Sequence, residues 1–201
     1  MQRWTETTNE LDKAVAEALD KELKRRRKYA AFFDFSDKKA KERGVVTTLL
    51  ESMERKGAAV FRGPVQSVDE KDQWPDCRAV DVEGRNVAFE VTELVSQEAI
   101  EANQHVGDKW CWWSDADVVG RLEKILQEKD QCSFHGNSFA SVVLVIHTDE
   151  PTLEPDKIDS LLKGHIFPKL RNIEEVYLLM SYSPKLGGGY YPYFKLGLSS
   201  E

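Results

Sequence analysis

Long hydrophobic runs are missing from this sequence. No window approaches the roughly 20 apolar residues that span a bilayer. The opening segment, MQRWTETTNELDK, lacks the apolar stretch that defines a signal peptide. We therefore expect a cytoplasmic protein that does not enter a membrane.

Cysteine is scarce as well. The three cysteines, Cys77, Cys111 and Cys132, are an odd number, and their spacings match neither a zinc site nor a redox motif. Reduced thiols without an assigned role are the expectation for such a set in the cytoplasm. The sequence also lacks a Gly-rich phosphate loop, a nucleophile elbow and any internal repeat.

Positive charge is outweighed by negative charge. The net charge of −7 argues against a protein that coats nucleic acid. The basic residues nevertheless cluster early in the chain, at Lys21, Lys24, Arg25, Arg26, Arg27, Lys28, Lys38, Lys39, Lys41 and Arg43. This cluster is explained either by a local basic surface or by a solvated helix face.

What the chain does contain is enough apolar material for one domain. Of its 201 residues, 41% are hydrophobic and 31% are charged. An amphipathic helix is predicted from Thr8 towards Phe33, and we assign residues 1–35 to a helical appendage and residues 36–201 to the domain itself. The apolar face of this first helix packs on the domain or, alternatively, forms a homodimer contact.

A second helix is predicted from Ser36 or Asp37, either of which can cap it, to about Arg55. Its apolar residues form one stripe, and Glu42 falls near the middle of that stripe. Glu51 falls on the opposite side. Glu42 is therefore the better candidate for an acid that faces a site beneath the helix, unless it marks the point where the apolar face reaches solvent.

A hairpin follows, with strands at 77–82 and 86–92 joined by a Glu-Gly-Arg turn. Alternation along the second strand places Val87, Phe89 and Val91 on one face and Glu90 on the other. A carboxylate in so apolar a strand needs compensation, and a divalent cation shared with Asp76 supplies it. An arginine or a helix terminus is the alternative partner for Glu90.

The remaining pattern predicts an α/β fold. Strands are expected at 58–61, 138–147, 176–182 and 191–198, a polar loop at 63–73, and helices at 118–131 and 155–163. Asp115 or Asp117 is expected to cap the first of these helices, with Lys124 and Lys129 away from its apolar face. This order predicts a three-layer-like sandwich in which helices flank a central mixed sheet.

Three tryptophans, Trp110, Trp112 and Trp113, stand close together before that helix. They either line a groove that stacks nucleic-acid bases or form a hydrophobic lid. A homodimer surface that includes the same patch is a third interpretation.

The order of these elements resembles the PD-(D/E)XK nuclease superfamily. The matching features are a helix with an acid (Glu42), a strand, the dipeptide Pro75-Asp76, and a hairpin to a strand that carries Glu90, followed by a helix and a buried strand. The resemblance covers roughly residues 36–150. The chain also resembles an uncharacterised group of small bacterial proteins with this core, in three segments: VTELVSQEAIE, the tryptophan patch and YYPYFKLGL.

The resemblance implies a restriction-endonuclease-like core and hydrolysis of phosphodiester bonds. Asp76, Glu90 and the carbonyl of Val91 would hold Mg²⁺ or Mn²⁺, with Glu42 nearby. Phosphate contacts would come from Lys24, Arg25, Arg26, Arg27, Lys28 and Lys124. DNA is the expected partner.

One position departs from the family pattern. Thr92 stands where the family has a lysine, and a hydroxyl cannot supply that positive charge. Lys109, Lys124 and Lys129 are the candidates for a substitute, and Glu93 is a candidate for an added metal ligand. A fold that kept its shape and lost its activity, serving as a binding or regulatory module, is the competing hypothesis.

Overall fold

The computed structural model describes residue 30 and residues 37–68, 74–105, 110–131, 139–181 and 191–200. Apart from Ala30, the predicted N-terminal appendage lies outside these residues, and so does its basic run from Lys24 to Lys28. Lys109 and Cys132 also lie outside them.

The centre of the fold is a six-stranded mixed sheet with the strand order β1-β2-β3-β4-β5-β6. Its strands are β1 (Phe61–Ser67), β2 (Cys77–Asp81), β3 (Asn86–Glu93), β4 (Ser141–Thr148), β5 (Glu175–Met180) and β6 (Tyr193–Lys195). Strands β3, β4 and β5 run parallel to one another, and the remaining neighbours pair antiparallel. The predicted α/β class and mixed sheet are confirmed.

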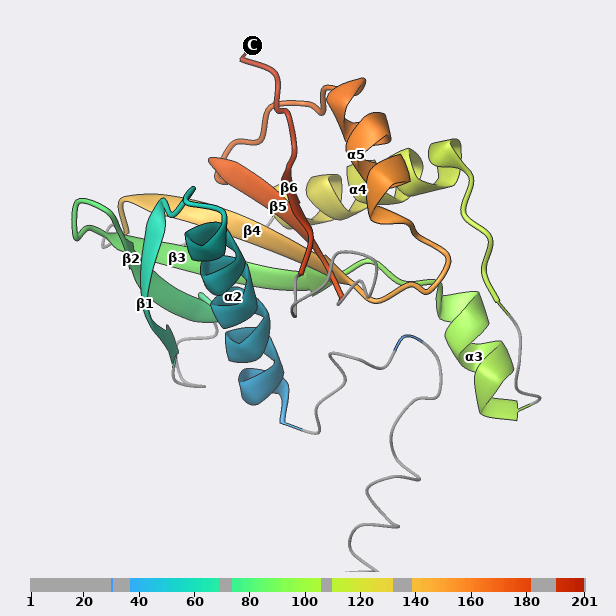
Figure 1. The fold of residues 1–201 in the computed structure, drawn as a ribbon, viewed down its shortest axis with the longest axis horizontal. Coiled ribbons are helices and arrows are strands. Elements are labelled where there is room, and N and C mark those ends of the chain that lie inside the picture. The colour runs from blue at the N-terminus through green and yellow to red at the C-terminus, as the bar shows by residue number, and fades with distance from the viewer. Residues whose placement is uncertain are drawn as a thin grey trace, which may run out of the picture.

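Helices cover both faces of this sheet (Figure 1). They are α2 (Lys38–Arg55), α3 (Gln97–His105), α4 (Asp115–Asp130) and α5 (Pro155–Lys163). Helix α2 packs on the face that includes Val87, Phe89 and Val91, whereas α4 and α5 pack on the face that includes Ala88. The predicted alternation of β3 is therefore confirmed, and it directs Glu90 towards the α4 side.

Strand β4 lies in the interior of the sheet and is buried along nearly its whole length. Val143 and Val145 contact the α2 side, while Leu144 and Ile146 contact the α4 side. A strand covered on both faces was predicted from its continuous apolar run, and the structure confirms it.

The predicted first strand and the loop after it are wrong. β1 begins at Phe61 and continues to Ser67, through Gly63 and Pro64, which we expected in a loop. The register is irregular between Arg62 and Gln66, and β1 is an edge strand. Proline has no amide hydrogen and cannot donate a hydrogen bond to the neighbouring strand. An edge strand with a bulge can nevertheless accommodate it.

Two helix predictions also need correction. Helix α3 was not predicted, because its sequence, QEAIEANQH, is mostly polar. Helix α4 is capped by Ser114 rather than by Asp115 or Asp117. Asp117 takes part instead as the third residue of a capping box, in which its carboxylate accepts hydrogen bonds from the backbone and hydroxyl of Ser114. Within the described residues, every helix is too short or too polar to cross a membrane.

Candidate active site

The register of the hairpin places Asp76 next to Glu90. Cys77 pairs with Phe89 in the antiparallel β2–β3 ladder. Asp76, the residue before Cys77, therefore lies opposite Glu90, the residue after Phe89. The backbone N–H of Val91 donates a hydrogen bond of 2.8 Å to Asp76 Oδ2. The Asp76 carboxylate therefore takes the place of a backbone carbonyl as the acceptor in the ladder. The Pro-Asp dipeptide thus anchors an acid at the start of β2.

Pro75 has a complementary effect on Val91. Continuing the register sets Pro75 opposite Val91, and proline has no N–H to donate to the Val91 carbonyl. In an antiparallel ladder, the N–H and C=O of one residue point to the same neighbouring strand. The Val91 carbonyl is therefore directed to the side of β3 that holds Asp76.

A lysine from α4 meets Glu90. Lys129 Nζ lies 2.5 Å from Glu90 Oε1, and the two side chains are 24% and 13% exposed. Lys129 continues the buried stripe of α4, three residues after Leu126 and four after Ile125. The prediction that Lys129 lies away from this apolar face is wrong. Of the two candidate lysines that the structure describes, Lys124 and Lys129, it brings Lys129 to the acids.

Helix α2 contributes a further acid and a further lysine. Glu42 is buried among the apolar residues of α2, as predicted, whereas Glu51 is exposed. Burial and the negative charge of Asp76 raise the pKa of Glu42, and Lys38 Nζ lies 3.3 Å from Glu42 Oε1. The fold therefore gathers three carboxylates and two ammonium groups from β2, β3, α2 and α4.

The acids of this cluster repel one another. Burial is the main cause that raises the pKa of Glu90, and the negative charge of Asp76 adds to it, against the opposing effects of Lys129 and Lys38. Burial and Asp76 likewise raise the pKa of Glu42. Cys77, beside them, has its pKa raised by burial to about 12, so its thiol stays protonated.

The other predicted residues have different surroundings. Thr92 is half-buried on β3, and Glu93 pairs with Lys41 at 3.3 Å. Lys124 is exposed on α4 with Glu128 at 3.9 Å. Lys38 was not predicted as a site residue. The signal was present, since Lys38 stands four residues before Glu42 on the same helix.

The donor atoms suit a hard divalent cation in kind. Carboxylate and backbone carbonyl oxygens are the usual ligands of Mg²⁺ and Mn²⁺. A cation would also offset the repulsion that raises the pKa values of Glu42 and Glu90. Within the described ranges, no group of three or more His, Cys, Asp or Glu side chains has an arrangement ready to hold a metal ion. The ligands that fit a divalent cation are therefore two acidic side chains, Asp76 and Glu90, together with the Val91 carbonyl.

Comparisons with known proteins do not extend this picture: no family model, no curated protein and no solved structure matches the chain.

Proposed function

We propose that this protein is a Mg²⁺- or Mn²⁺-dependent nuclease that hydrolyses phosphodiester bonds in DNA, built on a restriction-endonuclease-like fold. The observation that carries the proposal is the contact of Lys129 with Glu90, beside Asp76. Lys129 supplies from α4 the positive charge that Thr92 cannot supply from β3. The helix, hairpin and buried strand support the same kinship, because they occur in the order that the resemblance implies.

Each side chain has a distinct role in this proposal. Asp76 and Glu90, with the Val91 carbonyl, hold the cation, and the hydrogen bond from Val91 N–H fixes the Asp76 carboxylate in place. The cation, when bound, supplies Lewis acidity towards the phosphate oxygens. The Lys129 ammonium orients the attacking water and stabilises the charge that develops on the phosphate. Glu42 positions Asp76 from the α2 side.

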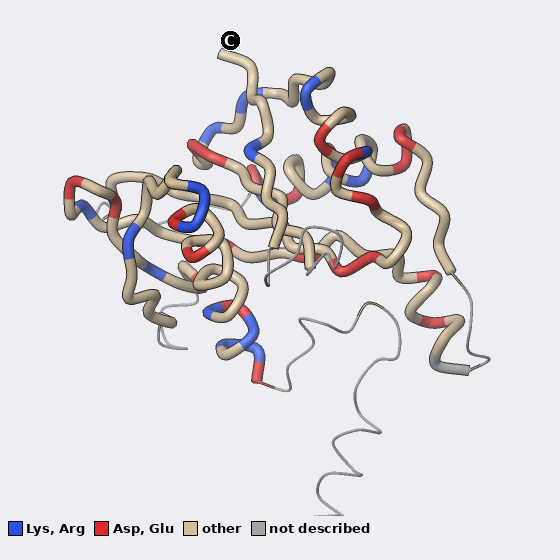
Figure 2. Tube along the Cα trace, viewed as in Figure 1, with Lys and Arg blue, Asp and Glu red and all other residues tan. Residues whose placement is uncertain are grey.

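A basic surface lies beside these acids. The first turns of α2 carry several lysine and arginine residues, which Figure 2 shows gathered at that end of the helix. They are Lys38, Lys39, Lys41 and Arg43. Positive charge next to the acids offsets the net charge of −7 locally and favours contacts with a phosphate backbone. We assign DNA binding to this surface and, as predicted, to Lys24–Lys28 and Lys124.

Calorimetric titration with Mn²⁺ tests the site directly. We expect the wild type to bind Mn²⁺ and the double variant Asp76→Ala, Glu90→Ala to lose that binding. The matched control is Asp81→Ala, which removes a carboxylate from the opposite end of the same hairpin. Equal heats from the wild type and the double variant would remove the proposal.

Cleavage of plasmid and single-stranded DNA tests the activity. We expect cleavage that requires Mg²⁺ or Mn²⁺ and disappears in Glu90→Ala. The second candidate function is a non-catalytic binding or regulatory module, favoured by Thr92 and by the net charge of −7. Mn²⁺ binding without cleavage of either DNA would select this module over the nuclease.

A further inference from the structure

The three tryptophans line a cavity that is separate from the candidate active site and lies at the opposite end of α4 from Lys129. The cavity has a volume of about 420 Å³ and lies between the segment that enters α4 and the start of α5. At 1.5 Å per residue, the fourteen positions between Asp115 and Lys129 separate the two places by about 21 Å along the helix. An inference about this cavity is therefore independent of the proposed nuclease.

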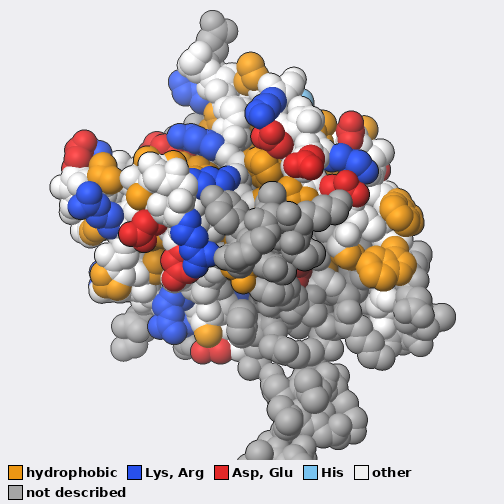
Figure 3. All heavy atoms as spheres, viewed as in Figure 1, with side chains coloured by type: hydrophobic (Ala, Val, Ile, Leu, Met, Phe, Trp, Pro, Cys, Tyr) orange, Lys and Arg blue, Asp and Glu red, His pale blue; other side chains and the backbone are white. Residues whose placement is uncertain are grey.

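The aromatic rings are accessible. Trp112 is 82% exposed and Trp110 is 54% exposed, while Trp113 packs partly against the core. Hydrophobic side chains stand out at the right-hand edge of the face in Figure 3, with acidic side chains near them. Exposed indoles cost free energy in water. Since two of the three rings are exposed, the tryptophans do not form a closed hydrophobic lid. They suit a partner that covers their faces.

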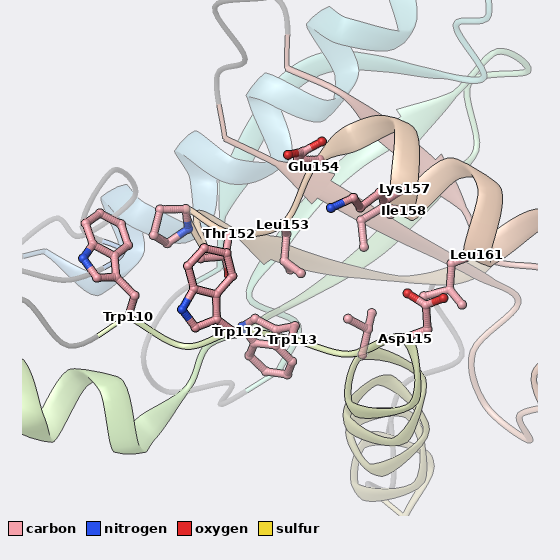
Figure 4. Close-up of a pocket in the computed structure, with 12 residues that line it drawn as sticks. Trp110, Trp112, Trp113, Asp115, Thr152, Leu153, Glu154, Lys157, Ile158 and Leu161 are labelled. Carbon is pink, nitrogen blue, oxygen red and sulfur yellow. The ribbon is translucent and has the colours of Figure 1, made fainter.

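Charged side chains share the cavity with the rings. Asp115 from α4 and Glu154 and Lys157 from α5 and its cap line it together with the tryptophans (Figure 4). In the part of the chain that the structure describes, none of these three side chains takes part in a hydrogen bond or an ion pair. Their polar atoms are therefore available to a ligand.

The charge around the cavity is predominantly negative. Among the described residues that line the cavity, the charged side chains are those of Asp115, Glu154 and Lys157. Two lining carboxylates oppose one lining ammonium group, so a polyanion such as single-stranded DNA would be disfavoured. A cation would be attracted both by the carboxylates and by the faces of the indoles.

We propose that this cavity, the tryptophan cleft, binds an arginine side chain presented by a basic segment of a partner protein. The planar guanidinium stacks on an indole face and donates paired hydrogen bonds to a carboxylate, a combination that lysine does not offer. The cavity is large enough for one such side chain, and the exposed rim formed by Trp110 and Trp112 contacts the flanking peptide. Trp and Arg together are typical of the residues that dominate protein interfaces.

The test uses the full chain and a capped peptide, Gly-Arg-Gly-Arg-Gly, titrated to millimolar concentration. The indole N–H signals of the five tryptophans are followed by NMR and assigned through Trp→Phe variants. We expect shifts confined to Trp110, Trp112 and Trp113. Replacing both arginines by citrulline keeps the shape and removes the charge, so it should weaken binding at least about tenfold.

Variants locate the site. Trp112→Ala should abolish the shifts without affecting the fold, since this side chain is largely exposed. The double variant Asp115→Asn, Glu154→Gln should weaken binding about tenfold, whereas the surface control Glu128→Gln, Asp159→Asn should not. Absence of shifts, equal affinity for the citrulline peptide, or stronger shifts of the same signals with oligothymidylate would each overturn the proposal. Concentration-dependent dimerisation lost in Trp112→Ala would overturn it in favour of a second copy of the chain.

Discussion

The hairpin formed by β2 and β3 has an aspartate at each end, and the two aspartates have opposite surroundings. At the turn, Asp81 accepts hydrogen bonds from the backbone N–H groups of Glu83 and Arg85 and from Arg85 Nε, at 2.7–2.9 Å. At the start of β2, Asp76 accepts one backbone hydrogen bond and lies beside two further acids, Glu42 and Glu90. The aspartate at the turn is held by three hydrogen bonds, whereas the aspartate at the start of β2 lies among further acids.

The pKa directions express this difference. Desolvation acts to raise the pKa of Asp81, but the hydrogen bonds from Arg85 and Glu83 outweigh it and hold the pKa below its ordinary value. At the other end, burial and repulsion by Asp76 raise the pKa values of Glu90 and Glu42. Stabilising contacts explain Asp81 completely. Glu90 and Glu42 are placed at a cost to stability, which is the pattern expected of a functional site.

The largest expected effect separates two cationic side chains that contact acids of the hairpin, Lys129 of α4 at Glu90 and Arg85 at Asp81. Lys129→Met should reduce the rate of the proposed DNA cleavage by about a hundredfold or more, because it removes the charge that stabilises the phosphate. Arg85→Met, its counterpart at the turn, should leave the rate unchanged and lower only the melting temperature. Cleavage rates under single-turnover conditions make the comparison.

Two further variants serve as controls for Lys129→Met. Lys129→Arg keeps the positive charge and should retain part of the activity, and Lys163→Met changes an exposed lysine on α5 that has no role in the proposal and should retain all of it. Equal rates for Lys129→Met and Lys163→Met would show that the contact with Glu90 is structural only.

Much of this arrangement could be predicted from the sequence, because it follows from periodicity. Alternation along residues 86–92 fixed the face of Glu90, and the helical stripe around Val45 and Leu49 fixed the burial of Glu42. Both patterns depend on neighbours that are close in the chain, and local geometry determines such patterns.

The remainder depends on contacts between distant segments. Lys129 of α4 meets Glu90 of β3 across a chain separation of 39 residues, which carries no local signal for that contact. The stripe of Leu122, Ile125 and Leu126 does extend to Lys129, so its core-facing position was available from spacing. The β1 boundary failed for a different reason: Gly63 and Pro64 favour loops, and pairing with β2 overrides that preference.

A smaller effect concerns stability and should have opposite signs at the two ends. Glu42→Gln removes one charge from the acidic cluster and should raise the free energy of unfolding by about 1 kcal/mol in the absence of divalent cations. Asp81→Asn should lower the melting temperature, because the amide replaces a carboxylate that accepts three hydrogen bonds. Thermal unfolding in EDTA measures both. A loss of stability in Glu42→Gln would mean that the Lys38 contact outweighs the repulsion by Asp76.

The smallest effect is a difference in the pH dependence of stability. Glu42 and Glu90 have folded-state pKa values above the ordinary 4.5, so the folded state binds more protons than the unfolded state above that pH. Their contribution to stability is therefore complete below pH 4.5 and is lost as the pH rises through the raised values. Asp81 behaves in the opposite way: its contribution is present above pH 3.8 and is lost as the pH falls through its lowered value.

Urea unfolding at a series of pH values separates these two slopes. The double variant Glu42→Gln, Glu90→Gln should lose the decline of stability above pH 4.5 and keep the decline at acid pH, whereas Asp81→Asn should do the reverse. Saturating Mn²⁺ should also abolish the upper decline in the wild type, because a cation that binds the ionised acids favours their charged forms. An upper decline that persists unchanged with Mn²⁺ would place the cation elsewhere, and the acids at the start of β2 would then repel one another without serving a metal.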